Sequence, residues 1–215
     1  MPFTRFNLST LLVSIPAILL CLTVHEMAHG YAAYLLGDAT AKHDGRLSFN
    51  PLRHIDPIGF LCLLVAGFGW AKPVMVDPRN FKKPRRDMAI VAAAGPLSNF
   101  LLAFLLTILW LALSLSSNGV LLAAAQFFAV AASMSIGLGV FNLIPIPPLD
   151  GSKVLLPVLP SSVISFFYRY ERYIQVGMLL LLWFGKFDYP LSISSRFIAV
   201  HFIDAAVFIL SFFGV

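Results

Sequence analysis

Charged residues are scarce in this sequence. Only 12% of the 215 residues are charged, whereas 59% are hydrophobic, and the mean hydropathy is +0.87. Soluble domains carry about 25% charged residues, so the composition excludes an ordinary soluble protein. The stretch from Met88 to Leu149 contains no Asp, Glu, Lys, Arg or His, and its 62 residues are enough for two membrane spans of about 20 residues each.

Cysteine and basic residues before the first apolar segment are also in short supply. Cys21 and Cys62 both lie in apolar segments, where they indicate small buried hydrophobic residues and not a disulfide framework. The first apolar segment is preceded by little basic charge (Arg5) and lacks a convincing cleavage site, so we interpret it as retained and not as a signal peptide. The net charge of +5 is concentrated in loops, so it concerns membrane orientation and predicts no nucleic-acid partner.

Long apolar runs without strict alternation predict membrane helices and not barrel strands. We expect about five transmembrane helices, at 9–36, 88–115, 120–144, from about 162 onward, and 194–215. Residues 57–71 are apolar but short, with one proline and three glycines, which favours a re-entrant segment. The fold class is therefore an all-α polytopic membrane protein with a short re-entrant segment, and with a small β-strand or hairpin at "GRLSF", 45–49.

Basic residues in the loops predict the orientation. The loop at 72–87 holds six Lys or Arg residues against two Asp residues, which places it in the cytoplasm by the positive-inside rule. The loop at 38–56 also contains Lys42, Arg46 and Arg53, and if both loops are inside, the segment at 57–71 enters the membrane and returns. Two spans then follow, so Asp150 is expected near the cytoplasmic face.

Ionisable residues stand inside the first apolar run, in "LLCLTVHEMAHGYAAYLLG", 19–37. His25 and His29 are four positions apart and share one helix face, whereas Glu26 lies about 100° around the helix. This HExxH pattern can bind zinc through its two imidazoles and leave Glu26 as a general base. Such a pattern also arises by chance, and a lone histidine is more often a hydrogen-bonded core residue. Unpaired ionisable groups cost roughly 2.5 kcal/mol or more each at the centre of a membrane helix, which favours a functional metal site.

A catalytic zinc takes three protein ligands and keeps a further position open. The candidates for the third ligand are His43, His54, Asp150, His201 and Asp204. We favour Asp150, because it follows a long uncharged helix within the irregular segment "PIPPLDG", and irregular backbone at membrane depth lines a cavity or is buried in protein. The alternative is that Asp150 caps the next helix.

These motifs carry a resemblance to a known family. "HEMAHG" at 25–30, "AAGPLSN" at 93–99 and "NLIPIPPLDG" at 142–151 resemble the site-2 protease family of intramembrane zinc metalloproteases, of the M50 type. "GRLSFNPLRHIDPIG" at 45–59 is similar to the small bacterial subgroup that lacks a PDZ domain. The resemblance covers roughly residues 10–155.

The resemblance implies a specific site and activity. It implies that His25, His29 and Asp150 bind one zinc ion and that Glu26 is the catalytic base. Residues 1–155 then form the metalloprotease core, and 156–215 form C-terminal transmembrane helices of the same domain. The implied substrates are transmembrane proteins in a lipid bilayer, and the implied location is a bacterial cell membrane. The oligomeric state is left open. The alternatives are a zinc-binding membrane transporter and a non-catalytic membrane scaffold.

Other polar residues in apolar segments have two interpretations each. Asn142 donates either to the oxyanion of the reaction or to a neighbouring helix, and we weigh these equally. Asn99, beside Gly95 and Ser98, indicates close helix packing more than chemistry. His54 either assists at the site or makes local hydrogen bonds. His201 and Asp204 share a helix face, where a polar pair buried between helices is favoured over a second metal site.

Local unwinding of a substrate helix exposes its backbone, which is costly in lipid. A strand edge near the site would pair with the unwound segment, and "GRLSF", 45–49, is the candidate edge.

Overall fold

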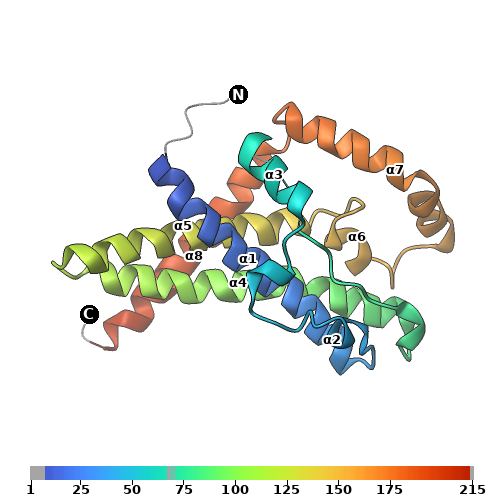
Figure 1. Ribbon diagram of the computed structural model, residues 1–215, viewed down its shortest axis with the longest axis horizontal. Coiled ribbons are helices and arrows are strands. Elements are labelled where there is room, and N and C mark those ends of the chain that lie inside the picture. Colours follow the sequence, from blue (N-terminus) through green and yellow to red (C-terminus); the bar gives the residue numbers. More distant parts are fainter. Residues whose placement is uncertain (1–7, 67–68, 70, 214–215) are drawn as a thin grey trace. The chain divides into compact units, whose positions relative to one another are not determined.

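The computed structural model describes residues 8–66, 69 and 71–213 (Figure 1). Within these ranges the chain is mostly helical and contains no strand. The long helices are α1 (Leu8–Leu35), α4 (Pro84–Ser114), α5 (Gly119–Asn142), α7 (Ser161–Trp183) and α8 (Asp188–Ser211). The short ones are α2 (Thr40–His43), η1 (Pro51–Arg53), α3 (Pro57–Ala66), η2 (Pro78–Asn80) and α6 (Asp150–Val154).

Four helices are long and apolar enough to cross a membrane, and they are α1, α4, α5 and α8. The outer face of α4 illustrates why: Leu97, Leu101, Leu105 and Leu109 recur every fourth residue and are 61%, 62%, 50% and 45% exposed. A stripe of exposed leucines at helical spacing is unfavourable in water and suits a helix that faces lipid.

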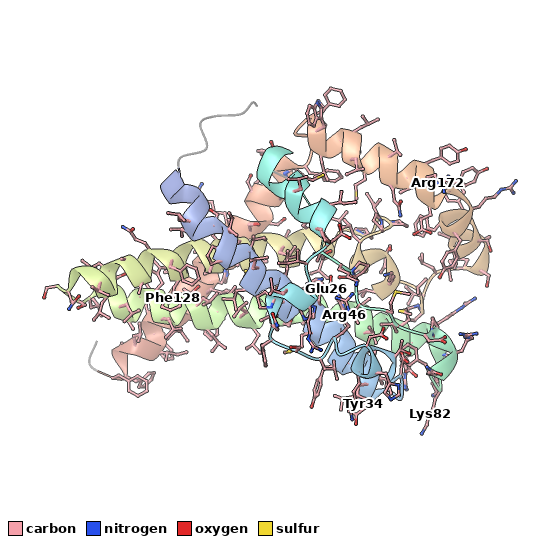
Figure 2. The ribbon with its side chains drawn as sticks, in the orientation of Figure 1. Glu26, Tyr34, Arg46, Lys82, Phe128 and Arg172 are labelled. Carbon is pink, nitrogen blue, oxygen red and sulfur yellow. The ribbon has the colours of Figure 1, made fainter. Side chains whose placement is uncertain are left out.

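The expected fifth span does not meet the same criterion. Helix α7 begins at Ser161, close to the predicted start, but it carries Arg169, Glu171 and Arg172 near its middle. Its mean hydropathy and charge therefore leave it outside the group of candidate spans in the described part of the chain. Figure 2 shows Arg172 and Lys82 pointing away from the ribbon, as exposed charged side chains do.

The expected strand at 45–49 is wrong. These residues form turns and bends, and an isolated β-bridge instead pairs Ile55 with Ala71. The segment folds around its arginines: the Arg46 side chain donates to the carbonyl of Arg53, and the Arg53 side chain donates to the carbonyl of Gly45 at 2.6 Å. Gly45 also has a φ of +65°, which is incompatible with extended strand geometry.

The candidate re-entrant segment begins as a helix. α3 has 10 residues, which corresponds to about 15 Å of helix and is half the thickness of the hydrocarbon core. This length is consistent with a segment that does not span, while residues 67, 68 and 70 lie outside the described ranges.

The chain forms two compact units, each built from separated segments. The first contains the residues up to Cys21, Asn99–Asn142 and Tyr170–Val215, and the second contains Leu22–Ser98 and Leu143–Arg169. In the first unit, Ala17, Leu106, Ala131 and Ala132 form a buried cluster of small and apolar side chains. In the second, Ala33, Phe81 and Val91 do so. The expected division at residue 155 stays a prediction.

Close packing of α4 and α5 holds the first unit together. Asn99 is fully buried, and its carbonyl accepts a hydrogen bond from the hydroxyl of Ser135 at 2.8 Å. The neighbouring α5 residue Gly139 faces the Phe100 ring so closely that an added Cβ would lie 2.7 Å from it. Small residues let membrane helices approach in this way, as predicted for Asn99.

Candidate metal centre

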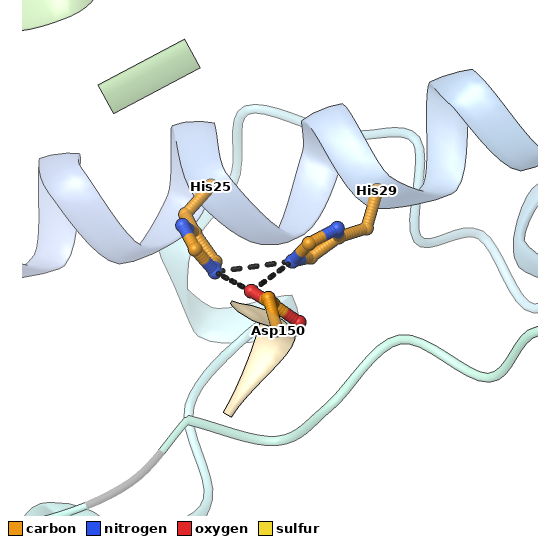
Figure 3. Close-up of side chains that lie close together, drawn as sticks. All are labelled: His25, His29 and Asp150. Carbon is orange, nitrogen blue, oxygen red and sulfur yellow. Dashed lines mark hydrogen bonds and ion pairs between the residues drawn. The ribbon is translucent and has the colours of Figure 1, made fainter. Parts of the chain in front are cut away.

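Two histidines on α1 point toward the same place. His25 and His29 are 4% and 9% exposed, and their Nε2 atoms lie 3.0 Å apart. One helical turn separates the two residues, so their side chains project from one face of α1. Figure 3 shows both rings directed at the carboxylate of Asp150.

Asp150 reaches the histidines from a distant part of the sequence. Its Oδ2 lies 3.1 Å from Nε2 of His25 and 3.1 Å from Nε2 of His29. Asp150 is the first residue of α6, and its side chain contacts the two histidines and does not cap a following helix. A glycine is needed beside it, because a Cβ at Gly151 would overlap the carbonyls of Leu143 and Ile144.

Helix α4 supports the histidines from the other side. Nδ1 of His29 lies 2.7 Å from the carbonyl oxygen of Val91, so Nδ1–H donates and Nε2 is left with a free lone pair. Metal-binding histidines usually donate their second ring nitrogen in this way. One turn further along α4, a Cβ at Gly95 would overlap the ring of His29. Gly95 therefore leaves the space that the histidine pair occupies.

The three donor atoms fit a catalytic zinc ion. Among the described residues, His25, His29 and Asp150 form a group whose possible ligand atoms all lie within 4.8 Å of one another. Two imidazole nitrogens and one carboxylate oxygen are a common ligand set for catalytic zinc. Ligand atoms around tetrahedral zinc are about 3.4 Å apart for bonds near 2.1 Å, and the separations of 3.0–3.1 Å are a few tenths of an ångström shorter.

Glu26 is held by a backbone group and not by a cation. Its Oε2 accepts a hydrogen bond from the N–H of Val74 at 3.0 Å. Val74 lies in an irregular segment that begins at the bridge residue Ala71, and in this segment the N–H of Lys72 donates to the carbonyl of His54. One oxygen of Glu26 is thereby fixed in position.

Asp38 anchors the same segment further along, and the sequence analysis missed it. It is fully buried and accepts hydrogen bonds from Thr40, from the N–H of Asp77 and from the amide of Asn80. Burial alone would raise the pKa of Asp38, but these hydrogen bonds outweigh burial and hold the pKa below its ordinary value. The available signal was an acidic residue directly after the glycine that ends α1.

The other candidate ligands lie apart from this group. His43 is exposed, and His54 is buried with Nε2 at 2.8 Å from the carbonyl of Ser48, which agrees with the local hydrogen bond weighed for it. His201 and Asp204 are exposed on α8, and Nδ1 of His201 lies 2.8 Å from the carbonyl of Phe197. The preference for a buried His201–Asp204 pair is therefore wrong, because this face of α8 is not covered by another described helix.

Asn142 is the last residue of α5 and belongs to the first compact unit, whereas the histidines belong to the second. Its amide donates to the carbonyl of Leu138, one turn back, at 3.0 Å. Its expected contact with the oxyanion stays a prediction.

Known proteins are similar to this sequence over most of its length. The sequence model of peptidase family M50 matches residues 13–184. The chain is 40% identical over 185 residues to "Putative zinc metalloprotease YwhC" of Bacillus subtilis, which covers 83% of this chain and 84% of that protein. It is 33% identical over 169 residues to "Putative zinc metalloprotease Rip2" of Mycobacterium tuberculosis, with 76% and 63% covered.

A relative from an archaeon is similar as well. "Putative zinc metalloprotease MJ0611" of Methanocaldococcus jannaschii is 29% identical over 156 residues, with 71% of this chain and 74% of that protein covered. No solved structure matches the chain significantly. The apolar helices and the family match together make it a multi-pass membrane protein. Because the match covers far more than half of the sequence, the chain belongs to peptidase family M50.

Proposed function

We propose that this protein is an intramembrane zinc metalloprotease that hydrolyses peptide bonds in or near the transmembrane segments of membrane proteins. The observation that carries the proposal is the convergence of His25, His29 and Asp150 within 3.1 Å of one another in a multi-pass chain of family M50. Buried ionisable groups in such a chain are energetically costly, so their presence favours a functional site.

In this proposal, His25, His29 and Asp150 hold one zinc ion per chain. Bound zinc supplies Lewis-acid chemistry, which polarises a peptide carbonyl and makes water more acidic. Glu26 accepts a proton from the attacking water and delivers it to the leaving amine. The Val74 N–H fixes Oε2 of Glu26, which leaves Oε1 available for the proton.

The amide of Asn142 is the proposed donor to the oxyanion. To act, it would have to exchange its present bond to the carbonyl of Leu138 for one to the substrate. That exchange is feasible because the carbonyl of Leu138 lies four residues before Asn142, where an α-helix pairs it with the backbone N–H of Asn142.

The segment 71–77 takes over the substrate-pairing role first expected at 45–49. It is free of helix, its one β-bridge among the described residues is at Ala71, and it holds Glu26 through Val74. An unwound substrate that adds to this edge by backbone hydrogen bonds would lie beside the proposed base. The basic loop at 72–87 supports a cell-membrane location with the site toward the cytoplasm.

The test is co-expression of this protein with a panel of single-span substrates. Wild type is compared with Glu26→Gln and with Glu171→Gln, a control that makes the same change on the exposed face of α7. We expect wild type and the control to cleave, Glu26→Gln to lose at least 100-fold in rate, and all three to bind one zinc ion. Zinc is measured in the same preparations by elemental analysis. A folded wild type without zinc, or a fully active Glu26→Gln, would contradict the proposal.

A further inference from the structure

A cavity lies in the first compact unit, between α4, α5 and α8. Its volume is about 400 Å³, and its lining includes Thr107, Trp110, Ser133, Ser192, Ser195 and Arg196. Cavities of this size bind small molecules and lipid fragments. It shares no residue with the metal group.

Arg196 is the unusual member of this lining. It lies within the candidate span α8, eight residues after Asp188. Within the described ranges, it forms neither a hydrogen bond nor an ion pair, and its side chain is exposed. An arginine without a carboxylate partner can bind an anionic group through charge-assisted hydrogen bonds.

The rest of the lining also favours an anion. No lining residue carries a carboxylate, whereas Arg196 carries a guanidinium, Trp110 carries an indole N–H and four lining residues carry hydroxyl groups. Two hydroxyls are already used as donors, from Thr107 to Ala103 and from Ser192 to Tyr189. Within the described ranges, the hydroxyls of Ser133 and Ser195 have no partner, and together with the guanidinium of Arg196 they are suitable donors for a phosphate group.

The residues along α8 follow the order of polar and apolar parts in a lipid molecule. Asp188 begins the helix and Tyr189 is exposed, as aromatic residues are at a membrane interface. Arg196 lies about 12 Å further along the axis, and helix side chains lean toward the N-terminus, so its guanidinium extends back toward the interface. Ala199 and Ile203 line the cavity beyond it. The α8 lining is thus polar near the start of the helix and apolar further along it.

We propose that this cavity binds an anionic phospholipid, with the lipid phosphate on Arg196 and an acyl chain along Ala199 and Ile203. A second copy of this chain is a poorer occupant. The carboxylates of α8, Asp188 and Asp204, lie eight residues on either side of Arg196, which is about 12 Å in depth. In a symmetric membrane dimer equivalent residues keep the same depth, so neither carboxylate meets the partner's guanidinium.

The test measures lipid binding to the full chain in detergent micelles by native mass spectrometry. Phosphatidylglycerol is compared with phosphatidylcholine of the same acyl chains. We expect wild type to prefer phosphatidylglycerol and Arg196→Gln to bind it about tenfold more weakly, because a charge-assisted hydrogen bond is lost. Arg172→Gln removes an exposed arginine outside the cavity, so this control keeps the preference.

A second variant tests the apolar part of the cavity. Ala199→Phe fills it and keeps the guanidinium, and we expect weaker binding of phosphatidylglycerol. Inorganic phosphate in millimolar excess, added together with phosphatidylcholine, should compete with phosphatidylglycerol weakly or not at all, because inorganic phosphate lacks an acyl chain. Equal binding of both lipids, or full binding by Arg196→Gln, would overturn the proposal. The proposal would also be overturned if the protein showed no lipid preference and instead bound a polyleucine transmembrane peptide with a central Glu more tightly than the same peptide with a central Gln.

Discussion

Gly95→Ala should weaken zinc binding without touching a ligand. A Cβ at this position would overlap the ring of His29 and lie 2.7 Å from Cε1 of His25, whereas ordinary contact begins near 3.4 Å. The His25 ring would have to recede by about 0.7 Å, and His29 by more. Metal sites tolerate changes of about 0.2 Å in ligand position, so the three donor atoms could no longer converge.

The size of the effect follows from the crowding. Overpacking a close-packed site costs about 1–3 kcal/mol, and disturbing the surroundings of a metal ligand weakens metal binding about 10–100-fold. We therefore expect zinc affinity to fall at least about tenfold, measured by competition with a calibrated chelator. Proteolysis of a test substrate should fall with zinc occupancy and recover in part when zinc is added.

Two other glycines provide matched controls. A Cβ at Gly137, also in a long apolar helix, meets nothing within 4 Å, so Gly137→Ala should leave zinc affinity unchanged. Gly139→Ala would crowd the Phe100 ring and should lower thermal stability, again without an effect on zinc affinity in the folded protein. Wild-type zinc affinity in Gly95→Ala would refute the assignment of this space to the histidine pair.

Two predictions concern the segment beside the site. Val74→Pro removes the N–H that holds Glu26, which is a hydrogen bond to a charged group worth about 1.5–3 kcal/mol. Its loss should lower kcat at least tenfold with zinc content unchanged. Met75→Pro is the control, and equal kcat values in the two variants would contradict the role of Val74. Asp38→Asn should make the segment more sensitive to limited proteolysis, whereas the exposed Asp44→Asn should not. Because folding lowers the pKa of Asp38, its stabilising effect is complete above the unfolded pKa of about 3.9 and is lost as the pH falls through the folded value. Protease sensitivity of the wild type should therefore increase at acidic pH, and the difference between wild type and Asp38→Asn should shrink there; a difference that does not depend on pH would contradict this assignment.

The sequence predicted the helices well because their signal is local. The expected helices at 9–36, 88–115 and 120–144 match α1, α4 and α5 to within a few residues. Uninterrupted apolar runs fix such helices, since a backbone in lipid must satisfy its own hydrogen bonds. The last helix, α8, begins at Asp188, before the predicted start at residue 194, because Pro190 is tolerated in the first turn of a helix.

Errors occurred where the outcome depends on distant partners. Residues 45–49 have the composition of a strand, but no described segment forms a β-ladder with them, and Arg46 and Arg53 bind backbone carbonyls instead. The pairing at Ile55 and Ala71 joins residues on either side of α3, and nothing in the local sequence indicates it.

By itself, the sequence determined that the chain enters the membrane repeatedly and that His25, Glu26 and His29 share one helix. It also made Asp150 the favoured third ligand, on the strength of a break in an otherwise uncharged region. Only the tertiary structure brought the Asp150 carboxylate to 3.1 Å from both imidazoles, placed the Val91 carbonyl behind His29, and used Gly95 to leave room for the rings. The physical reason is that helix formation depends on neighbouring residues, whereas a metal site depends on donor atoms more than 100 positions apart in sequence.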